Sequence, residues 1–172
     1  MKPLPPGPFS TIYADPPWPE RGGGRIKRGA DRHYPLLSVT EIAALPVAGI
    51  AAPDAHLYLW VTNNYLPAGF DVMQAWGFRY VTCITWAKEG RFGLGQYFRG
   101  KTEHCLFGVR GKAHRQGQGT TLIWAPPTVH SCKPEEMRAL IQTVSSPPRL
   151  ELFARRQVKG WMVWGEEVDP CE

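Results

Sequence analysis

Closely spaced cysteines are missing from this sequence. Its four cysteines lie far apart, and no Cys-x-x-Cys pair occurs among Cys83, Cys105, Cys132 and Cys171. Because zinc sites and disulfide frameworks depend on paired cysteine spacings, we predict neither of them, and no metal site. We expect these cysteines to pack mostly as small buried hydrophobic residues.

Two further absences limit the location and the cofactor. No apolar run approaches the roughly 18 residues of a membrane span, and Met1 to Pro6 lacks the apolar region of a signal peptide. The default expectation is therefore a cytoplasmic protein without membrane contact. The motif Gly-x-Gly-x-x-Gly does not occur either, which disfavours a nicotinamide or flavin dinucleotide site, since the pyrophosphate needs that close backbone approach.

The composition indicates one globular domain, residues 1–172. Apolar residues make up 43% and aromatic residues 12% of the chain, enough to bury a core. The net charge of +5 favours a polyanionic partner, because basic side chains that neutralise phosphates release counterions. The basic residues gather in two groups: Arg21, Arg25, Lys27, Arg28 and Arg32, and then Arg91, Arg99, Lys101, Arg110, Lys112 and Arg115.

The hydrophobic pattern predicts strands that alternate with helices. We expect strands at about 9–14, 55–62, 78–88, 104–109, 121–125, 149–154 and 161–164, and helices at about 38–45, 66–76 and 134–144. Ser38 and Glu41 have the spacing of a capping box at the start of the first helix. The alternation predicts a single-domain α/β fold with a doubly wound, mainly parallel sheet.

The most informative stretch is Asp15-Pro16-Pro17-Trp18, directly after the first predicted strand. The two prolines stiffen the turn and hold the carboxylate at the carboxyl end of a strand, where ligands bind in open α/β sheets. A carboxylate and a backbone carbonyl can accept the two N–H groups of an exocyclic aromatic amine and favour the pyramidal geometry that frees its lone pair. The indole can stack on the base. The alternative is a proline-rich surface turn in which Trp18 is simply packed.

This motif is similar to the catalytic tetrad of adenine-N6 methyltransferases of the MT-A family, which includes the mRNA m6A writers and bacterial and phage relatives. Six other segments resemble the family's blocks in the family's order: 57–62 (LYLWVT), 76–78 (WGF), 84–88 (ITWAK), 103–111 (EHCLFGVRG), 133–136 (KPEE) and 150–155 (LELFAR). The resemblance implies methyl transfer from S-adenosylmethionine to N6 of adenine in nucleic acid, with all four tetrad residues catalytic. Because the compact chain looks more like bacterial or phage members, we expect DNA ahead of RNA.

The resemblance also implies a cofactor pocket beside Asp15. In the permuted class that this chain resembles, the strand ending in the tetrad precedes the strand of the cofactor pocket, here 149–154. Lys133, at a helix start, could pair with the cofactor carboxylate together with the free N–H groups of the first turn; the alternative is a solvated surface lysine. Where the family has an Asn-Gln pair, this chain has two glutamates. The implied cofactor contacts are Asp15, Lys133, Glu151, Phe153, Arg155, Gly165, Glu166 and Glu167.

Two long loops are predicted to bind nucleic acid around Asp15. The first, 19–33, is rich in glycine and basic residues; the second, 89–101, interleaves aromatic and basic residues, which suits base stacking with phosphate contact. The alternatives are a surface loop without a role and aromatic residues that cap the core. The resemblance places Tyr34 close to the acceptor base. The predicted substrate contacts are Tyr34, Arg25, Lys27, Arg28, Lys88, Tyr97, Arg99, Lys101 and Glu103.

A rival interpretation is a non-catalytic, nucleic-acid-binding partner subunit of an active methyltransferase. The intact tetrad argues against it, since degenerate family members typically lose that motif. A homodimer or a partner subunit is left open.

Overall fold

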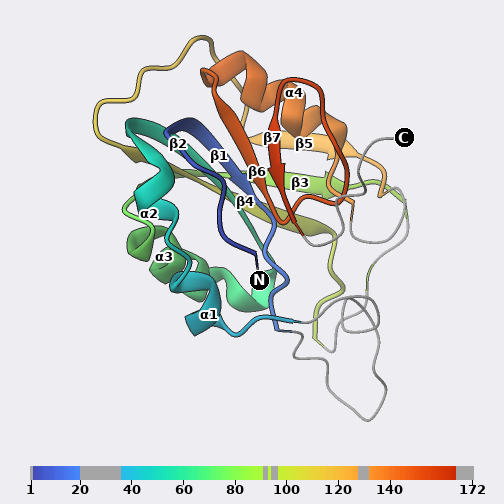
Figure 1. Cartoon of the computed structure of the whole chain (residues 1–172). Coiled ribbons are helices and arrows are strands. Elements are labelled where there is room, and N and C mark those ends of the chain that lie inside the picture. Colours follow the sequence, from blue (N-terminus) through green and yellow to red (C-terminus); the bar gives the residue numbers. More distant parts are fainter. Residues whose placement is uncertain (1, 20–35, 91–92, 94–96, 128–131, 166–172) are drawn as a thin grey trace.

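A computed structural model describes residues 2–19, 36–90, 93, 97–127 and 132–165. Its centre is a seven-stranded sheet in the order β5-β3-β4-β2-β1-β6-β7 (Figure 1). Of the described strands, only β4 runs antiparallel to its neighbours, and every other pair is parallel. A mainly parallel sheet in one α/β domain is thereby confirmed. The strands are β1 (Phe9–Ala14), β2 (Ala51–Val61), β3 (Arg79–Lys88), β4 (Thr102–Arg110), β5 (Leu122–Ala125), β6 (Arg149–Leu152) and β7 (Met162–Trp164).

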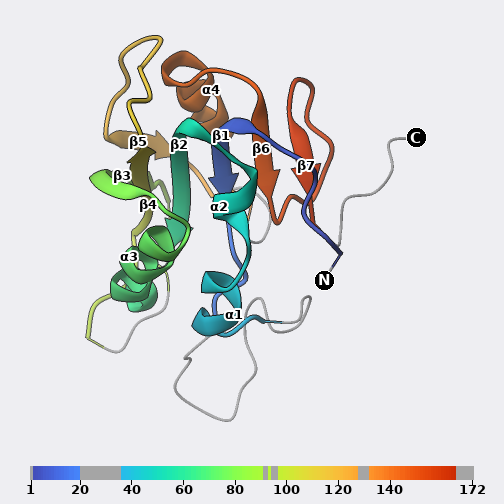
Figure 2. The same cartoon turned by 60° about the vertical axis from the view of Figure 1, so that its left-hand side comes forward.

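Helices cover both faces of the sheet. The helices α1 (Val39–Ala43), α2 (Val47–Ile50) and α3 (Leu66–Ala75) lie on one face, and α4 (Glu135–Val144) lies on the other (Figure 2). The predicted capping box begins α1: the Ser38 hydroxyl accepts from the Glu41 N–H, and the Glu41 carboxylate accepts from the Ser38 N–H. No helix within the described residues is long and apolar enough to cross a membrane.

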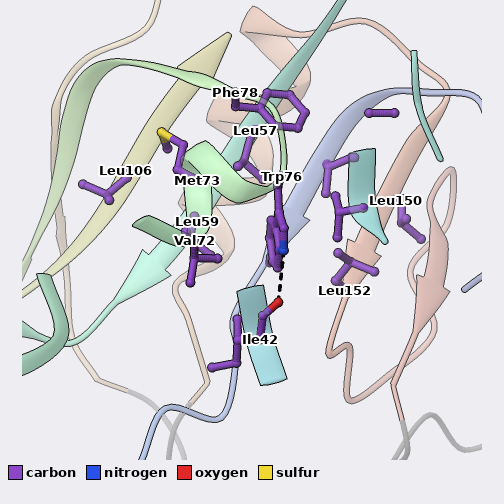
Figure 3. Packing of buried hydrophobic residues seen from close by; sticks show 14 of the residues in the cluster. Ile42, Leu57, Leu59, Val72, Met73, Trp76, Phe78, Leu106, Leu150 and Leu152 are labelled. Carbon is purple, nitrogen blue, oxygen red and sulfur yellow. Dashed lines mark hydrogen bonds between the residues drawn. The ribbon is translucent and has the colours of Figure 1, made fainter. Parts of the chain in front are cut away.

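The core forms one layer of buried side chains on each face of the sheet. On the face of α1 and α3, aliphatic residues of the strands surround Trp76, whose indole N–H donates to the Ile42 carbonyl at 3.0 Å (Figure 3). On the face of α4 the layer is richer in aromatic residues and includes Tyr13, Trp60 and Trp86. The central strand β2 is buried on both sides from residue 55 to 61, as its uninterrupted apolar run predicts.

Strand β2, helix α2 and strand β6 differ from the sequence-based expectation. Strand β2 begins at Ala51 instead of near residue 55, because its first residues pair with Phe9 across a register shift. Helix α2 has only four residues, too few for a helical repeat to be visible in the sequence. Strand β6 ends at Leu152, two residues early, because Phe153 has a positive φ of 62° that a strand does not accommodate.

The chain reverses its path across the sheet at β1. Strand β2 pairs with one side of β1, and β6, which follows α4, pairs with the other. In open α/β sheets, ligands bind outside the carboxyl ends of the strands at such a switch point. We call this end of the sheet, where β1 ends at Ala14, the carboxyl edge. Because β4 is antiparallel, its first residues also lie there, with Thr102 opposite Ala87 near the end of β3.

Candidate active site

Asp15 directly follows β1 at the carboxyl edge. Its backbone N–H donates to the Leu152 carbonyl of β6 at 3.5 Å, which ties the turn to the ends of both strands. The Trp18 N–H donates to the Pro16 carbonyl at 2.8 Å and closes the turn on itself. Because the backbone is fixed by proline and by these bonds, the carboxylate is held by a rigid support. The Pro16 carbonyl keeps a second lone pair with which it can accept from a ligand.

Trp18 packs into the core beneath this turn. Its ring is 5% exposed and stacks on Tyr65 with centroids 5.9 Å apart and planes 19° apart. The indole N–H donates to the Trp60 carbonyl of β2 at 2.8 Å. Trp18 is thus packed, as in the alternative interpretation, and it supports the turn at Asp15 from below; its predicted catalytic role stays a prediction.

Four residues of alternating charge are linked by ion pairs along the carboxyl edge. The Lys133 ammonium lies 2.8 Å from Asp15 Oδ2 and 3.4 Å from Glu103 Oε2, and the other oxygen of Glu103 accepts from Lys88. The Lys133 and Lys88 ammonium groups also lie over the rings of Trp60 and Trp86, 5.4 and 4.8 Å from the ring centroids. We call Asp15, Lys133, Glu103 and Lys88 the charge chain. Its side chains come from three strand ends and from the segment before α4.

The charge chain favours the ionised forms of Glu103 and Lys133. Burial by itself raises the pKa of Glu103, but Lys133 and Lys88 outweigh burial and lower that pKa below its usual value. Burial by itself lowers the pKa of Lys133, but Asp15 and Glu103 outweigh it and raise that pKa. The alternative of a solvated surface lysine does not describe Lys133, because its side chain is 14% exposed and faces two carboxylates.

The end of β6 is held to α4 and to β7. Both carboxylate oxygens of Glu151 accept from the Arg138 guanidinium, at 3.0 and 2.8 Å, so this side chain is committed to α4. Phe153 packs edge-on against Trp164, with ring centroids 5.5 Å apart. A Cβ on Gly165 would lie 2.1 Å from the Ala154 carbonyl oxygen, so only glycine allows this close approach of main chains. Arg155 is partly buried at the same end.

The predicted substrate residues of the second loop differ in their exposure and in their hydrogen bonds. Tyr97 is 92% exposed, which leaves its ring accessible for stacking. Lys101 donates to the carbonyls of Lys88 and Gly90, at 3.1 and 2.7 Å, and Arg99 donates to the Gly93 carbonyl at 3.1 Å. The predicted roles of six residues stay predictions because these residues lie outside the described part of the chain: Tyr34, Arg25, Lys27, Arg28, Glu166 and Glu167.

Sequence reasoning missed two residues that support the site. Trp60 provides both the carbonyl that binds Trp18 and the ring beneath Lys133. The position of Trp60 near the end of a predicted apolar strand was the feature of the sequence that could have indicated this role. Arg138 orients Glu151 from α4, and nothing local in the sequence pairs these two residues.

A known protein family matches most of this chain. The family model MT-A70 matches residues 9–167. The chain belongs to the MT-A70 family. The predicted resemblance is thereby confirmed over nearly the whole sequence.

The curated relatives of this MT-A70 chain include one protein named as an RNA methyltransferase and several named as N(6)-adenosine-methyltransferases. It is 33% identical over 175 residues to "N6-methyladenosine RNA methyltransferase MTA1" of Cryphonectria parasitica, covering 93% of this chain and 52% of that protein. It is 29% identical over 179 residues to the human "N(6)-adenosine-methyltransferase catalytic subunit METTL3", covering 95% and 29%. An MT-A70-like protein of Arabidopsis thaliana is 29% identical over 178 residues, covering 95% and 24%. The chain thus spans about half or less of the length of these relatives.

Proposed function

We propose that this chain is the catalytic domain of an S-adenosylmethionine-dependent methyltransferase that modifies the N6 amine of adenine in nucleic acid. The observation that carries the proposal is the Asp15 carboxylate, held on a rigid turn at the switch point of the sheet and paired with Lys133 at 2.8 Å. Membership of MT-A70, together with the printed names of the relatives, supports this reaction.

In this proposal Asp15 prepares the amine for attack. Lys133 binds Oδ2 and leaves Oδ1 to accept one N–H of the adenine amine. The Pro16 carbonyl accepts the other N–H with its second lone pair. Both acceptors favour the pyramidal nitrogen, whose lone pair is no longer delocalised into the ring. Preorganised polar groups of this kind are usually the largest single contribution to catalysis.

The residues at the end of β6 fit S-adenosylmethionine beside Asp15. When bound, this cofactor supplies a methyl group on a positively charged sulfur. Lys133 would bind its carboxylate, because an ammonium has three donors and Asp15 uses only one. The closely packed main chain at Gly165 and Phe153 would lie against the cofactor. Arg155, Glu166 and Glu167 would contact its ribose end. Glu151 would support this strand through Arg138. The proposal implies the permuted order, since β1 with the tetrad precedes the cofactor strand β6.

The target adenine must leave its base stack to reach Asp15. Inside a duplex the N6 amine is paired and flanked by neighbours, and extrusion costs a few kcal/mol, less in a single strand. The two basic loops and the exposed Tyr97 ring would bind the flanking nucleotides. We therefore expect faster methylation of an unpaired adenine than of the same adenine in a duplex. A clear preference for the duplex would mean that a DNA-opening element or a partner subunit takes part.

The experiment is incubation of the full chain with tritiated S-adenosylmethionine and matched DNA and RNA pools, single-stranded and annealed, followed by nucleoside mass spectrometry. We expect label in N6-methylated adenine nucleosides. The predicted preference for DNA stands against the RNA in the name of the Cryphonectria parasitica relative, and the matched pools decide between DNA and RNA. Binding of cofactor and nucleic acid without any transfer would instead favour the non-catalytic partner subunit. A homodimer, a partner chain and a cytoplasmic location stay predictions.

A further inference from the structure

We propose that Lys88 is a positioning residue for the methyl transfer: it holds Glu103 so that Lys133 stays on Asp15. This inference rests on the proposed function. It assigns Lys88 a role through the charge chain instead of through phosphate contact. The starting observation is that each oxygen of Glu103 has its own ammonium partner, Oε1 with Lys88 and Oε2 with Lys133.

Glu103 competes with Asp15 for Lys133. The Lys133 ammonium lies 2.8 Å from Asp15 Oδ2 and 3.4 Å from Glu103 Oε2, so it is shared unequally between the two carboxylates. All three side chains are at most 22% exposed, so the charges are only partly screened by water. An additional positive charge on Glu103 weakens its attraction for Lys133. Lys88 supplies that charge and shifts the balance towards Asp15.

The position of Lys88 is itself fixed by its surroundings. It is the last residue of β3, and its ammonium lies 4.8 Å from the centroid of the Trp86 ring. Its backbone N–H donates to the Lys101 carbonyl across the β3–β4 pair at 2.8 Å. Its side chain is 27% exposed, less than a freely solvated lysine, and its charge is directed to Glu103. These contacts suit a residue that orients its neighbour.

The test compares single and double variants of the full chain in the methyl-transfer assay. We expect Lys88→Met to lower kcat about tenfold, within the range of coupling between contacting residues, and to change the KM for nucleic acid less than about twofold. Lys88→Arg, which keeps the charge, should recover most of the loss. In a Glu103→Gln background, where no competing carboxylate remains, Lys88→Met should cost less than about twofold. Lys112→Met is the matched control, because this exposed lysine follows the end of β4 at the opposite edge.

A contact with phosphate predicts the opposite pattern. The KM for nucleic acid would then rise, the slope of log affinity against log salt would flatten by roughly 0.7–0.9, and the effect would persist in the Glu103→Gln background. That result would overturn the proposal.

A second measurement does not depend on activity and separates this inference from the proposed function. In crystal structures of the wild type and Lys88→Met, we expect Lys133 to leave Asp15 for Glu103 in the variant. If Lys133 remains within hydrogen-bond distance of Asp15 without Lys88, the positioning role is wrong, whatever the enzyme transfers. If Lys133 moves but the wild type transfers no methyl group, the proposed function fails and the role of Lys88 in holding Lys133 on Asp15 survives.

Discussion

Replacement of Asp15 by Asn tests the centre of the proposed chemistry. The amide keeps the shape of the side chain but removes the negative charge of the carboxylate. In the proposed function that carboxylate accepts an N–H of the adenine amine, and it pairs with Lys133. Loss of one preorganised group of this kind costs about 2.7–4 kcal/mol in the transition state, which lowers kcat by a factor of roughly a hundred to a thousand. Asp15→Ala should lose at least as much.

The same substitution should affect folding much less. Breaking a fully buried ion pair costs about 3–5 kcal/mol, and exposed pairs contribute about 0–1 kcal/mol. Asp15 is 22% exposed, and Lys133 keeps Glu103 at 3.4 Å, so we expect a loss on the order of 1 kcal/mol. That corresponds to a decrease of roughly 2–4 °C in Tm for a domain of this size. A native stability of about 5–15 kcal/mol tolerates such a loss, so unfolding cannot explain a hundredfold fall in activity.

The assay measures kcat and KM for methyl transfer, Tm, and cofactor affinity by calorimetry. Asp71→Asn, an equivalent change at an exposed position on α3, is the matched control and should leave all four unchanged. Turnover of Asp15→Asn within about threefold of the wild type would refute the role of this carboxylate. A large fall in Tm would mean that Asp15 acts mainly in the fold.

Three further outcomes are expected. Gly165→Ala should lower the free energy of unfolding by about 1–3 kcal/mol and weaken cofactor binding, because the new Cβ would meet the Ala154 main chain. Gly49→Ala, with open space around the new Cβ, should do neither. Equal Tm values for the two variants would contradict the expected steric conflict at Gly165. Burial lowers the pKa of His56 in the folded chain, so the unfolded chain binds more protons, and Tm should fall as pH drops from about 6.5 towards the lowered pKa of the folded state. His56→Asn should remove this fall in Tm while keeping a hydrogen-bond partner for Ser145. Identical pH profiles of variant and wild type would exclude His56 as the source of the fall. Replacing Arg25, Lys27 and Arg28 with Ala should weaken nucleic-acid binding and flatten its salt dependence by roughly 0.7–0.9 in log–log slope per lost phosphate contact. Cofactor affinity should stay unchanged. Superimposable salt titrations of variant and wild type would show that this loop does not contact phosphate.

The sequence predicts the elements that carry a strong local signal. The Ser38–Glu41 capping box begins α1, and Gly77, with φ of 82°, ends α3 as expected of a glycine after a helix. The direction of β4 has no such signal. Its connection to β3 is about a dozen residues long, which suits a hairpin as well as the crossover that parallel strands require.

The candidate site likewise has one part with a local sequence signal and one part that depends on contacts between distant residues. Asp15 is predictable because two prolines stop a buried strand, and that pattern lies within four residues. The contact of Asp15 with Lys133 joins residues 118 positions apart, and Glu103 and Lys88 reach them only through strand pairing. Trp18 shows the limit of motif reasoning, because the same residue can face a ligand or the core, and packing against Tyr65 decides it.

The reversed strand β4 makes the site open to redesign. A purely parallel sheet presents only strand ends at its ligand-binding edge, and each connection that leaves there must return through a crossover. The antiparallel pairing of β3 and β4 instead brings the chain back at the edge itself, so the connection between these two strands needs no crossover. Lys88 and Glu103 lie on the two strands of that pair, and Lys88 is two residues beyond Trp86, the residue that pairs with Glu103. Under the proposed function, a changed connection that keeps Lys101, whose carbonyl binds the Lys88 N–H, would alter the nucleotide contacts while Lys88 and Glu103 keep their places on the strands.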